Sequence, residues 1–342
     1  MTKNRKKTAD INISRKVAFL RLPSAYKEHP ARVDVVQTHM SWVFLTDRFV
    51  YKMKKPVQLD FLDFSTLERR RLNCLEELRL NRRLARDIYL EVIPLTVGEV
   101  GQLELGGEGE PVDWLVKMLR LPRDYMLDSA IARRQVDESQ LRQLARVLTN
   151  FYQQAEAVSL TTEEYLRQFE EDVQANDKAL LEPEYSLPGK QVSTISKSLL
   201  AYLSREQPVF DDRVKAHRIV EAHGDLRPEH ICLTDPPVII DCLEFNRRLR
   251  VLDVADELAF LAMECAHAGA PFIGPVLFEA YQQCSGDYPP QVLVRFYQTY
   301  RAQMRAKLAI WHLVDCDPGD HDKWVPRSKA YLRLAARFAS AL

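Results

Sequence analysis

The pattern of apolar and polar positions changes character near residue 120. Before it, β-branched and aromatic runs dominate: VDVVQTHMSWVFL, a TDR turn and FVYKMKKPV predict a hairpin of residues 33–45 and 48–54. Further strands are expected at 90–96, 100–105 and 112–119. The polar, basic stretch before them, interrupted by Pro23 and Pro30, predicts a weakly ordered arm over residues 1–30.

One long helix interrupts these strands. Ser65 is expected to cap its N-terminus, with Glu68 completing a capping box, and helical spacing continues to about Ala85. One stripe of this helix is predicted to face inward, and it comprises Cys74, Glu77, Leu80, Asn81 and Leu84.

After Leu121-Pro122 the helical period dominates. Helices are predicted at 136–158, 162–180, 192–205, 211–222, 253–268, 275–284, 290–314 and 327–341. Strand character returns only at 231–234 and 238–241, on either side of Asp235-Pro236-Pro237. The fold class expected is therefore α+β: a β-rich N-lobe with one long helix at 31–119, and a larger helical C-lobe at 120–342, which meet near 118–122.

Composition excludes several classes of function. The 48 basic and 48 acidic residues give no net charge, so we expect neither nucleic-acid nor membrane binding. The six cysteines form no CxxC pair, and no apolar run reaches 18 residues, so a reduced, cytoplasmic, soluble protein is expected. Neither GxxxxGK[ST] nor GxGxxG occurs, so any nucleotide must be held without a Walker-type loop.

The strongest chemical signal is HGDLRPEH, residues 223–230, followed by VIIDCLEF, which contains Asp241. A strand hairpin centred on Pro236-Pro237 would bring Asp225, His230 and Asp241 together. Such a group suits phosphoryl transfer, in which one carboxylate orients the incoming hydroxyl and another holds Mg²⁺ against the phosphates. Aspartates that merely cap a turn or end a strand are the structural alternative.

These two stretches resemble the catalytic core of the aminoglycoside phosphotransferase-like kinases, whose loop reads HGDxxxxN. The resemblance implies a bilobal protein-kinase-like fold with Asp225 as the catalytic base, Asp241 as the Mg²⁺ ligand and His223 as a structural residue of the catalytic loop. LDVADELAFL resembles the family's following segment, which implies that Asp253 and Glu257 brace the loop.

The resemblance extends from about residue 36 to 310. THMSWVFLTDRFVYKMKKPVQLDFLDFSTLERRRLNCLEELRLNRRLA and VDWLVKMLRLPRD are similar to the kinase-like portion of bacterial bifunctional aminoglycoside phosphotransferase/ATP-binding proteins. In those proteins a P-loop ATPase part follows, and none is expected here because the chain ends before one would fit.

The fold implied by the resemblance needs a lysine for the nucleotide phosphates and a glutamate that pairs with it. FVYKMKK offers Lys52, Lys54 and Lys55; strand alternation places Lys52 and Lys54 on one face, and the family pattern favours Lys52. Glu76 and Glu77 both lie on the long helix, and Glu77 is preferred because it shares the inward stripe. A solvated surface charge is the alternative for each.

Three further residues are expected to contact nucleotide. Ser41, in the glycine-free turn THMSW, would donate a hydroxyl to the phosphates; a simple turn serine is the alternative. Met118, within the connecting segment 117–119, would meet the adenine through its backbone, and Arg227 lies in the catalytic loop. His230 stands where the family has an asparagine that serves as the second metal ligand. Because imidazole is a poorer ligand for Mg²⁺ than for Mn²⁺ or Zn²⁺, the identity of a metal at this second position is left open.

The leading expectation is thus an ATP-dependent kinase of a small-molecule hydroxyl, with Mg²⁺ as the metal and Mn²⁺ as an alternative. A nucleotide-binding regulatory module without catalysis is the rival, motivated by His230 and the glycine-free turn. Aminoglycosides, sugars and amino-alcohols remain open as acceptors. A cationic acceptor would require acidic side chains nearby, and the candidates are Glu244, Asp256 and Glu264. An anionic acceptor would require basic side chains, and the candidates are Arg247, Arg248 and Arg250.

Overall fold

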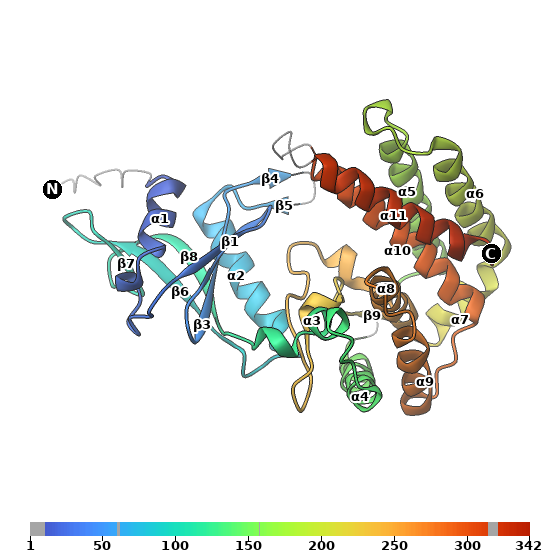
Figure 1. Ribbon diagram of the computed structural model, residues 1–342, viewed down its shortest axis with the longest axis horizontal. Helices are drawn as coiled ribbons and strands as arrows, with labels where there is room; N and C mark the ends of the chain where they lie inside the picture. Colours follow the sequence, from blue (N-terminus) through green and yellow to red (C-terminus); the bar gives the residue numbers. More distant parts are fainter. Residues whose placement is uncertain (1–10, 60–61, 157, 314–320) are drawn as a thin grey trace. The chain divides into compact units, whose positions relative to one another are not determined.

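The computed structural model describes residues 11–59, 62–156, 158–313 and 321–342, and Figure 1 traces them. Residues 1–10 of the expected arm and Cys316 lie outside these ranges. The chain forms two compact units: an N-terminal unit of residues 1–122 and 239–246, and a C-terminal unit of residues 123–238 and 247–342. The short segment 239–246 thus belongs to the N-terminal unit, although the sequence places it within the expected C-lobe.

The N-terminal unit is built on an antiparallel sheet with the strand order β1-β2-β3-β8-β6-β7. Its strands are β1 (Asp34–Gln37), β2 (Ser41–Leu45), β3 (Phe49–Lys54), β6 (Tyr89–Val97), β7 (Leu103–Leu105) and β8 (Glu110–Leu119). The segment 33–45 forms two strands that meet in the region of the predicted THMSW turn, where Thr38 hydrogen bonds with the backbone of Ser41. A second hairpin joins β4 (Gln58–Leu59) to β5 (Leu62–Asp63).

The segment before the sheet is more ordered than predicted. Residues Ile13–Leu20 form helix α1, which Asn12 caps, and a 3₁₀ turn follows at Pro23–Ala25. Val17 and Leu20 are buried in one apolar core with Tyr51 and Met53 of β3. The expectation of a weakly ordered arm therefore fails for residues 13–25, because an amphipathic helix underlies the basic composition.

Helix α2 (Leu67–Asn81) lies against β6 and β8. Its inward face is confirmed, since Cys74, Glu77, Leu80 and Asn81 are buried. The predicted N-cap is wrong by one residue: Thr66 accepts the hydrogen bond from Arg69 N, while Ser65 binds the side chain of Asp63.

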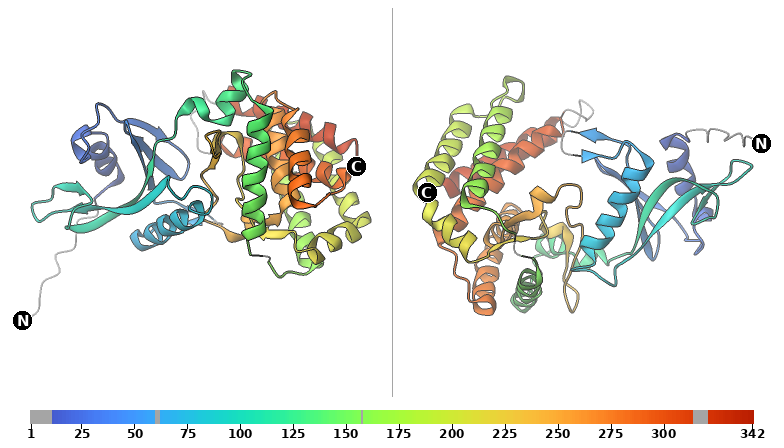
Figure 2. Two further views of the ribbon diagram at one scale, coloured as in Figure 1. Left: turned by 90° about the horizontal axis from the view of Figure 1, so that it is seen from below. Right: turned by 180° about the vertical axis from the view of Figure 1, so that it is seen from behind.

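The C-terminal unit is helical. Its helices are α3 (Leu127–Ala132), α4 (Glu138–Gln154), α5 (Thr162–Leu180), α6 (Gly189–Arg205), α7 (Gln207–Lys215), α8 (Val254–His267), α9 (Ile273–Ser285), α10 (Gln291–Trp311) and α11 (His321–Ala339). Helices α10 and α11 run side by side in Figures 1 and 2. Among the described residues, no helix combines the length and hydrophobicity needed to cross a membrane.

One predicted helix is partly wrong. The pattern predicted helix over 211–222, but α7 ends at Lys215, His217 takes a positive φ of 54°, and β9 (Ile219–Glu221) follows. β-branched Ile219 and Val220 favour the strand, which pairs with β12 (Val251–Asp253). The short strands β10 (Ile231–Cys232) and β11 (Val238–Ile239) form a further two-stranded sheet.

One buried carboxylate connects α1 and α2 to the sheet. Asp113 of β8 accepts hydrogen bonds from Lys16 at 2.9 Å and from Arg70 at 2.8 Å, and all three side chains are buried. Asp113→Asn would leave both cations buried without a counter-charge. We expect it to lower the free energy of unfolding by about 3–5 kcal/mol, as breaking a buried ion pair does.

Urea unfolding measures this loss. The control is Glu110→Gln, an exposed acid on the same strand, which should change stability by no more than about 0.5 kcal/mol. Equal stability of the two variants would contradict the assignment of Asp113 as the link between the helices and the sheet.

Candidate active site

Five charged side chains of the N-terminal unit form a cluster, here called the charge cluster, which is buried except at Lys52 and Asp241: Lys52, Lys54, Glu77, Asp241 and Glu244. Glu77 lies between the two lysines, with Oε1 3.0 Å from Lys52 Nζ and Oε2 paired with Lys54 Nζ. Lys52 also contacts Asp241 Oδ1 at 2.5 Å, and Lys54 pairs with Glu244. Both of the lysines that strand periodicity left open therefore contact the same glutamate.

Strand alternation explains this arrangement. Tyr51 and Met53 of β3 face the core shared with α1, so Lys52 and Lys54 point to the other face, toward α2. The two lysines differ in exposure: 14% of the Lys52 side chain is accessible, against 1% for Lys54. Lys52 is therefore the one that a ligand in solvent can reach.

The preference for Glu77 over Glu76 agrees with their positions. The Glu77 side chain is fully buried, whereas Glu76 pairs with Arg79 one turn along the outer face of α2. Burial by itself would raise the pKa of Glu77, but the ammonium groups of Lys52 and Lys54 outweigh it and lower that pKa. Burial likewise opposes the charged form of Lys52, and Asp241 and Glu77 nevertheless raise its pKa well above the ordinary value. Both partners are thus held ionised.

The backbone around Asp241 is held by α2 and β6. Asp241 has a positive φ of 60°, which is costly for a residue with a side chain. Its amide donates to the Tyr89 hydroxyl at 3.1 Å, and the Cys242 amide donates to Asn81 Oδ1 at 2.8 Å. Asn81 also donates to the Glu77 carbonyl at 2.9 Å, so the same side chain contacts both α2 and the Asp241 segment.

In the C-terminal unit, the loop that begins at His223 is anchored by one buried glutamate. Glu257 of α8 accepts the backbone N–H of His223 at 3.0 Å and of Gly224 at 2.6 Å, and the Tyr152 hydroxyl at 2.8 Å. The prediction that Glu257 braces the loop is confirmed. Asp253 instead caps α8 and pairs with Arg213, so its predicted contact with the loop is wrong.

Gly224 is required by its surroundings. It has a φ of +85°, and a Cβ there would lie 2.8 Å from the Cβ of Arg250. The next residue, Asp225, donates its amide to His223 Nδ1 at 3.3 Å, and its carboxylate lies 2.9 Å from Arg227 Nε. Arg227 also pairs with Glu229 at 2.6 Å. A cation therefore lies directly beside the carboxylate predicted to act as the base.

His230 has hydrogen bonds at both ring nitrogens. Its Nδ1 lies 2.8 Å from the Asp225 carbonyl and its Nε2 lies 3.1 Å from Arg227 Nη2. A guanidinium group only donates, so Nε2 accepts and Nδ1 carries the proton that it donates to the carbonyl. Metal binding by either nitrogen would break one of these bonds, which makes His230 a loop-bracing residue in this geometry.

The other predicted nucleotide contacts lie in the sheet of the N-terminal unit. Ser41 begins β2, and its buried hydroxyl has no hydrogen-bond partner among the described residues. Met118 lies inside β8, opposite Val50 on one side and Tyr89 on the other. Met118 is therefore part of the sheet ladder, and the chain leaves the strand only after Leu119.

The residues considered as acceptor-binding charges have internal partners. Glu244 pairs with Lys54, Asp256 with Arg301 at 2.5 Å, and Glu264 with Arg305 at 2.9 Å. The three arginines are also paired: Arg250 with Glu221 at 2.7 Å, Arg248 with Glu171 at 2.8 Å and Arg247 with Glu221 at 3.6 Å. Each of these residues therefore has a partner of opposite charge within the chain, and Arg247 and Arg250 share Glu221.

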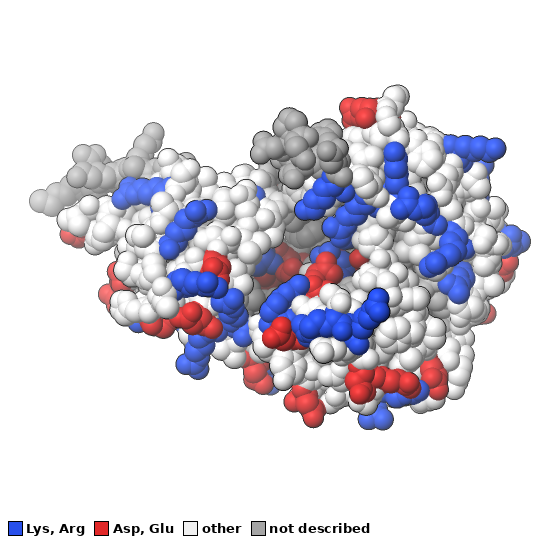
Figure 3. Space-filling view, viewed as in Figure 1, with Lys and Arg blue, Asp and Glu red and all other residues white. Residues whose placement is uncertain are grey.

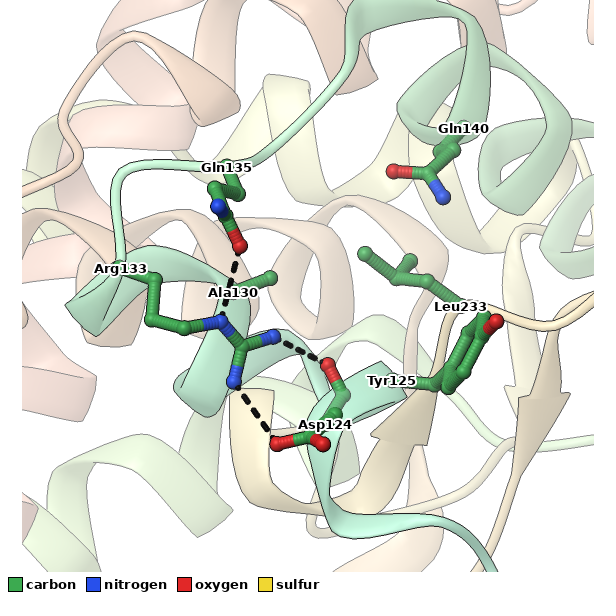
Figure 4. A pocket seen from close by; sticks show the side chains of 7 residues that line it. All are labelled: Asp124, Tyr125, Ala130, Arg133, Gln135, Gln140 and Leu233. Atoms are coloured by element: carbon green, nitrogen blue, oxygen red, sulfur yellow. Dashed lines mark hydrogen bonds and ion pairs between the residues drawn. The ribbon is translucent and has the colours of Figure 1, made fainter.

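A pocket of about 300 Å³ opens elsewhere in the C-terminal unit (Figure 4). Arg133 points across it and binds Gln135 at 2.9 Å and Asp124 at 3.2 Å. None of the predicted site residues lines this pocket, whose walls comprise Asp124, Tyr125, Ala130, Arg133, Gln135, Gln140 and Leu233. On the face of the molecule shown in Figure 3, Lys and Arg side chains are interspersed with Asp and Glu on both units.

The two units thus divide the predicted site. Lys52, Glu77, Ser41, Met118 and Asp241 belong to the N-terminal unit, while His223, Asp225, Arg227 and His230 belong to the C-terminal unit. The predicted convergence of Asp225, His230 and Asp241 stays a prediction. Sequence reasoning missed the parts played by Lys54, Asn81 and Tyr89, although strand alternation had placed Lys54 on the same face as Lys52 and helix periodicity had placed Asn81 on the inward stripe.

Two curated relatives are similar over most of this chain. Uncharacterized proteins of Mycobacterium tuberculosis and Mycobacterium bovis are each 34% identical over 289 residues, which is 81% of this chain and 54% of theirs. The chain therefore spans about half the length of the relatives it matches. No protein-family model matches it.

Solved structures establish the fold. A choline/ethanolamine kinase family protein from Mesorhizobium loti superposes with a TM-score of 0.51 and 15% identity, covering 95% of this chain and 98% of that one. Choline kinase from Cryptosporidium parvum superposes with a TM-score of 0.54 and 9% identity, covering 95% and 93%. The predicted α+β, protein-kinase-like fold is therefore confirmed, and the chain shares it with small-molecule kinases.

The buried bonds of Glu257 predict the effect of removing it. Glu257→Ala would leave the amides of His223 and Gly224 and the Tyr152 hydroxyl without their acceptor. Since each unsatisfied buried donor costs about 1–3 kcal/mol, we expect a loss of several kcal/mol of stability and faster hydrogen exchange at 223–224. Glu257→Gln keeps an acceptor and should lose less. Unchanged exchange at these amides in Glu257→Ala would show that the loop is held by other contacts.

Proposed function

We propose that the protein is an ATP-dependent phosphotransferase that moves a γ-phosphoryl group to the hydroxyl of a small-molecule acceptor. The observation that carries the proposal is the position of Lys52, whose ammonium group lies between Glu77 and Asp241 and remains partly exposed. In a protein-kinase-like fold a lysine so placed pairs with nucleotide phosphates. Ser41, whose buried hydroxyl has a hydrogen bond to spare, and Met118 are the further nucleotide contacts proposed in this unit.

The donor set of the charge cluster fits Mg²⁺. The cluster has three carboxyl groups and two ammonium groups, and burial raises the pKa of the Glu244 carboxyl while Lys52 and Lys54 lower that of Glu77. Asp241 is its most exposed carboxylate, with 40% of the side chain accessible. Mg²⁺ prefers oxygen ligands and needs one or two carboxylates besides phosphate oxygens and water. Asp241 would hold the ion, which when bound would neutralise charge on the phosphates.

Asp225 is the residue proposed to accept the hydrogen bond of the acceptor hydroxyl. Arg227 Nε lies 2.9 Å from the Asp225 carboxylate and is the cation next to the group proposed to receive the proton. The backbone of this loop is fixed by Glu257 and by the His223 ring. Arg227 is the loop's proposed contact for phosphate, and His223 and His230 hold the loop in shape. Phosphoryl transfer depends mainly on such positioning and on charge stabilisation.

The acceptor class proposed is a small alcohol, such as an amino-alcohol, a sugar or an aminoglycoside. Two neighbours of the same fold are named as choline or choline/ethanolamine kinases. Their likeness supports the reaction type and leaves the acceptor to be found by experiment.

A nucleotide-binding module without catalysis is the second candidate. The observation that favours it is His230, whose two ring nitrogens are both bonded within the loop where the family has a metal-binding asparagine. This candidate predicts that nucleotide raises the melting temperature and that no phosphate is transferred.

The first test is transfer itself. The protein is incubated with ATP, Mg²⁺ or Mn²⁺ and pools of amino-alcohols, sugars and aminoglycosides, and phosphorylated product is measured. Asp225→Asn should lower kcat by about 10²–10⁴-fold, the usual contribution of a general base, while nucleotide binding persists. Glu182→Gln, which neutralises an exposed acid of the same unit outside the loop, is the control and should keep the wild-type rate. No transfer by the wild type, or equal transfer by Asp225→Asn, would contradict the proposal.

The second test separates the two roles of His230. If it braces the loop, His230→Asn lowers stability by about 1–3 kcal/mol through the unsatisfied Asp225 carbonyl, and the ratio of activity in Mn²⁺ to that in Mg²⁺ stays the same. If it is a metal ligand, exchange of nitrogen for amide oxygen shifts that ratio toward Mg²⁺. Measuring initial rates at saturating amounts of each metal decides between the two.

A further inference from the structure

The second lysine of β3 raises a question that the proposed function leaves open. Lys54 is almost completely buried, and its ammonium group contacts Glu77 and Glu244. No ligand in solvent can reach it, so it does not bind phosphate in place of Lys52. Burying such a pair costs much of its attraction in lost hydration, so a buried ion pair is weak evidence of a purely stabilising role.

Glu244 belongs to a segment that joins the N-terminal unit from far along the chain. Residues 239–246 are more than a hundred positions beyond the rest of that unit, and they join it through side-chain contacts. The Asp241 and Cys242 amides bind Tyr89 and Asn81, and Arg83 lies 3.3 Å from Cys242 Sγ. Two ion pairs, Lys52 with Asp241 and Lys54 with Glu244, complete this set.

These contacts set where the Asp241 carboxylate lies. Its backbone is in a left-handed conformation that persists only when the surroundings hold it. Tyr89 and Asn81 fix the amides at 241 and 242, and Lys54 holds the segment three residues after Asp241. Because Glu77 contacts both lysines, the same cluster also fixes the Lys52 ammonium.

We propose that Lys54 and Glu244 are positioning residues, which hold the Asp241 segment on β3 and α2 so that Asp241 and Lys52 keep a fixed separation. The inference rests on the proposed function, since it concerns the carboxylate that would hold the metal and the lysine that would meet the phosphates. It predicts that loss of the pair lowers the metal-dependent affinity for nucleotide more than it lowers the free energy of unfolding.

Two variants separate positioning from stability. Lys54→Met leaves Glu244 buried without its cation and is expected to destabilise the protein. The double variant Lys54→Met/Glu244→Met also removes the Glu244 charge that Lys54→Met leaves unpaired, while Glu77 keeps its contact with Lys52, so it should be more stable than Lys54→Met. If the pair positions Asp241, the double variant regains stability relative to Lys54→Met but not the metal effect. If the pair is structural alone, it regains both.

The readout is the affinity for a fluorescent ATP analogue with Mg²⁺ and without it, together with urea unfolding. In the wild type Mg²⁺ should tighten binding. In the double variant this gain should fall by about 10-fold or more, the usual effect of changing a residue that supports a metal ligand. Binding without metal should change less, because Lys52 and Glu77 remain. Lys27→Met, at an exposed position of the same unit, is the matched control and should keep the full gain.

Hydrogen exchange of the ligand-free protein provides a second readout that needs no nucleotide. The amides of Asp241 and Cys242 should exchange faster in the double variant and in Glu244→Gln, while those of β8 stay protected. A double variant with the wild-type gain from Mg²⁺ and wild-type exchange overturns the positioning role. A wild type that gains nothing from Mg²⁺ overturns the proposed function and this inference with it, so the two failures are distinguishable.

Discussion

The N-terminal unit depends on one buried carboxylate, Glu77, which is shared between two ammonium groups. A carboxylate without hydration must be paired, and Lys52 and Lys54 supply one partner for each oxygen. The consequence is geometric. The pairing fixes α2 against β3 and at the same time places Lys54 where Glu244 can meet it. The helix, the strand and the distant segment are therefore held by one charge network.

The C-terminal unit also contains a buried carboxylate whose partners are supplied by neighbouring elements, and here they are backbone amides instead of ammonium groups. Glu257 is buried on α8 and takes the backbone N–H groups of His223 and Gly224, which would otherwise lack partners. Burial raises the pKa of Glu257, and the hydrogen bonds from the two amides and from the Tyr152 hydroxyl act in the opposite direction. In each unit, a buried glutamate on a helix fixes the element next to a candidate functional aspartate.

Sequence reasoning succeeds for the features that depend on the periodic spacing of apolar residues. The α+β class, the inward stripe of α2 and the preference for Glu77 follow from spacing, because burial selects one face of a helix. Helix α1 was missed because Arg15, which is exposed, and Lys16, which is buried against Asp113, interrupt its apolar pattern. Choosing between Lys52 and Lys54 was beyond periodicity, since alternation gives both the same face, and only their exposure separates them. Glu244 has no local signal, because its partner lies 190 residues away.

The N-terminal unit buries charged side chains where apolar ones could pack, and this choice requires an explanation. Apolar side chains of similar size would fill the same space at lower cost, since each buried ion loses its hydration. Apolar contacts are not directional, whereas Lys52 and Lys54 each require a carboxylate at a defined distance and angle. The contact with Lys52 acts together with the amide hydrogen bonds to Tyr89 and Asn81 to hold Asp241 in its left-handed backbone conformation. The cost in stability is thus consistent with a need for exact placement, which phosphoryl transfer has and a purely structural core does not.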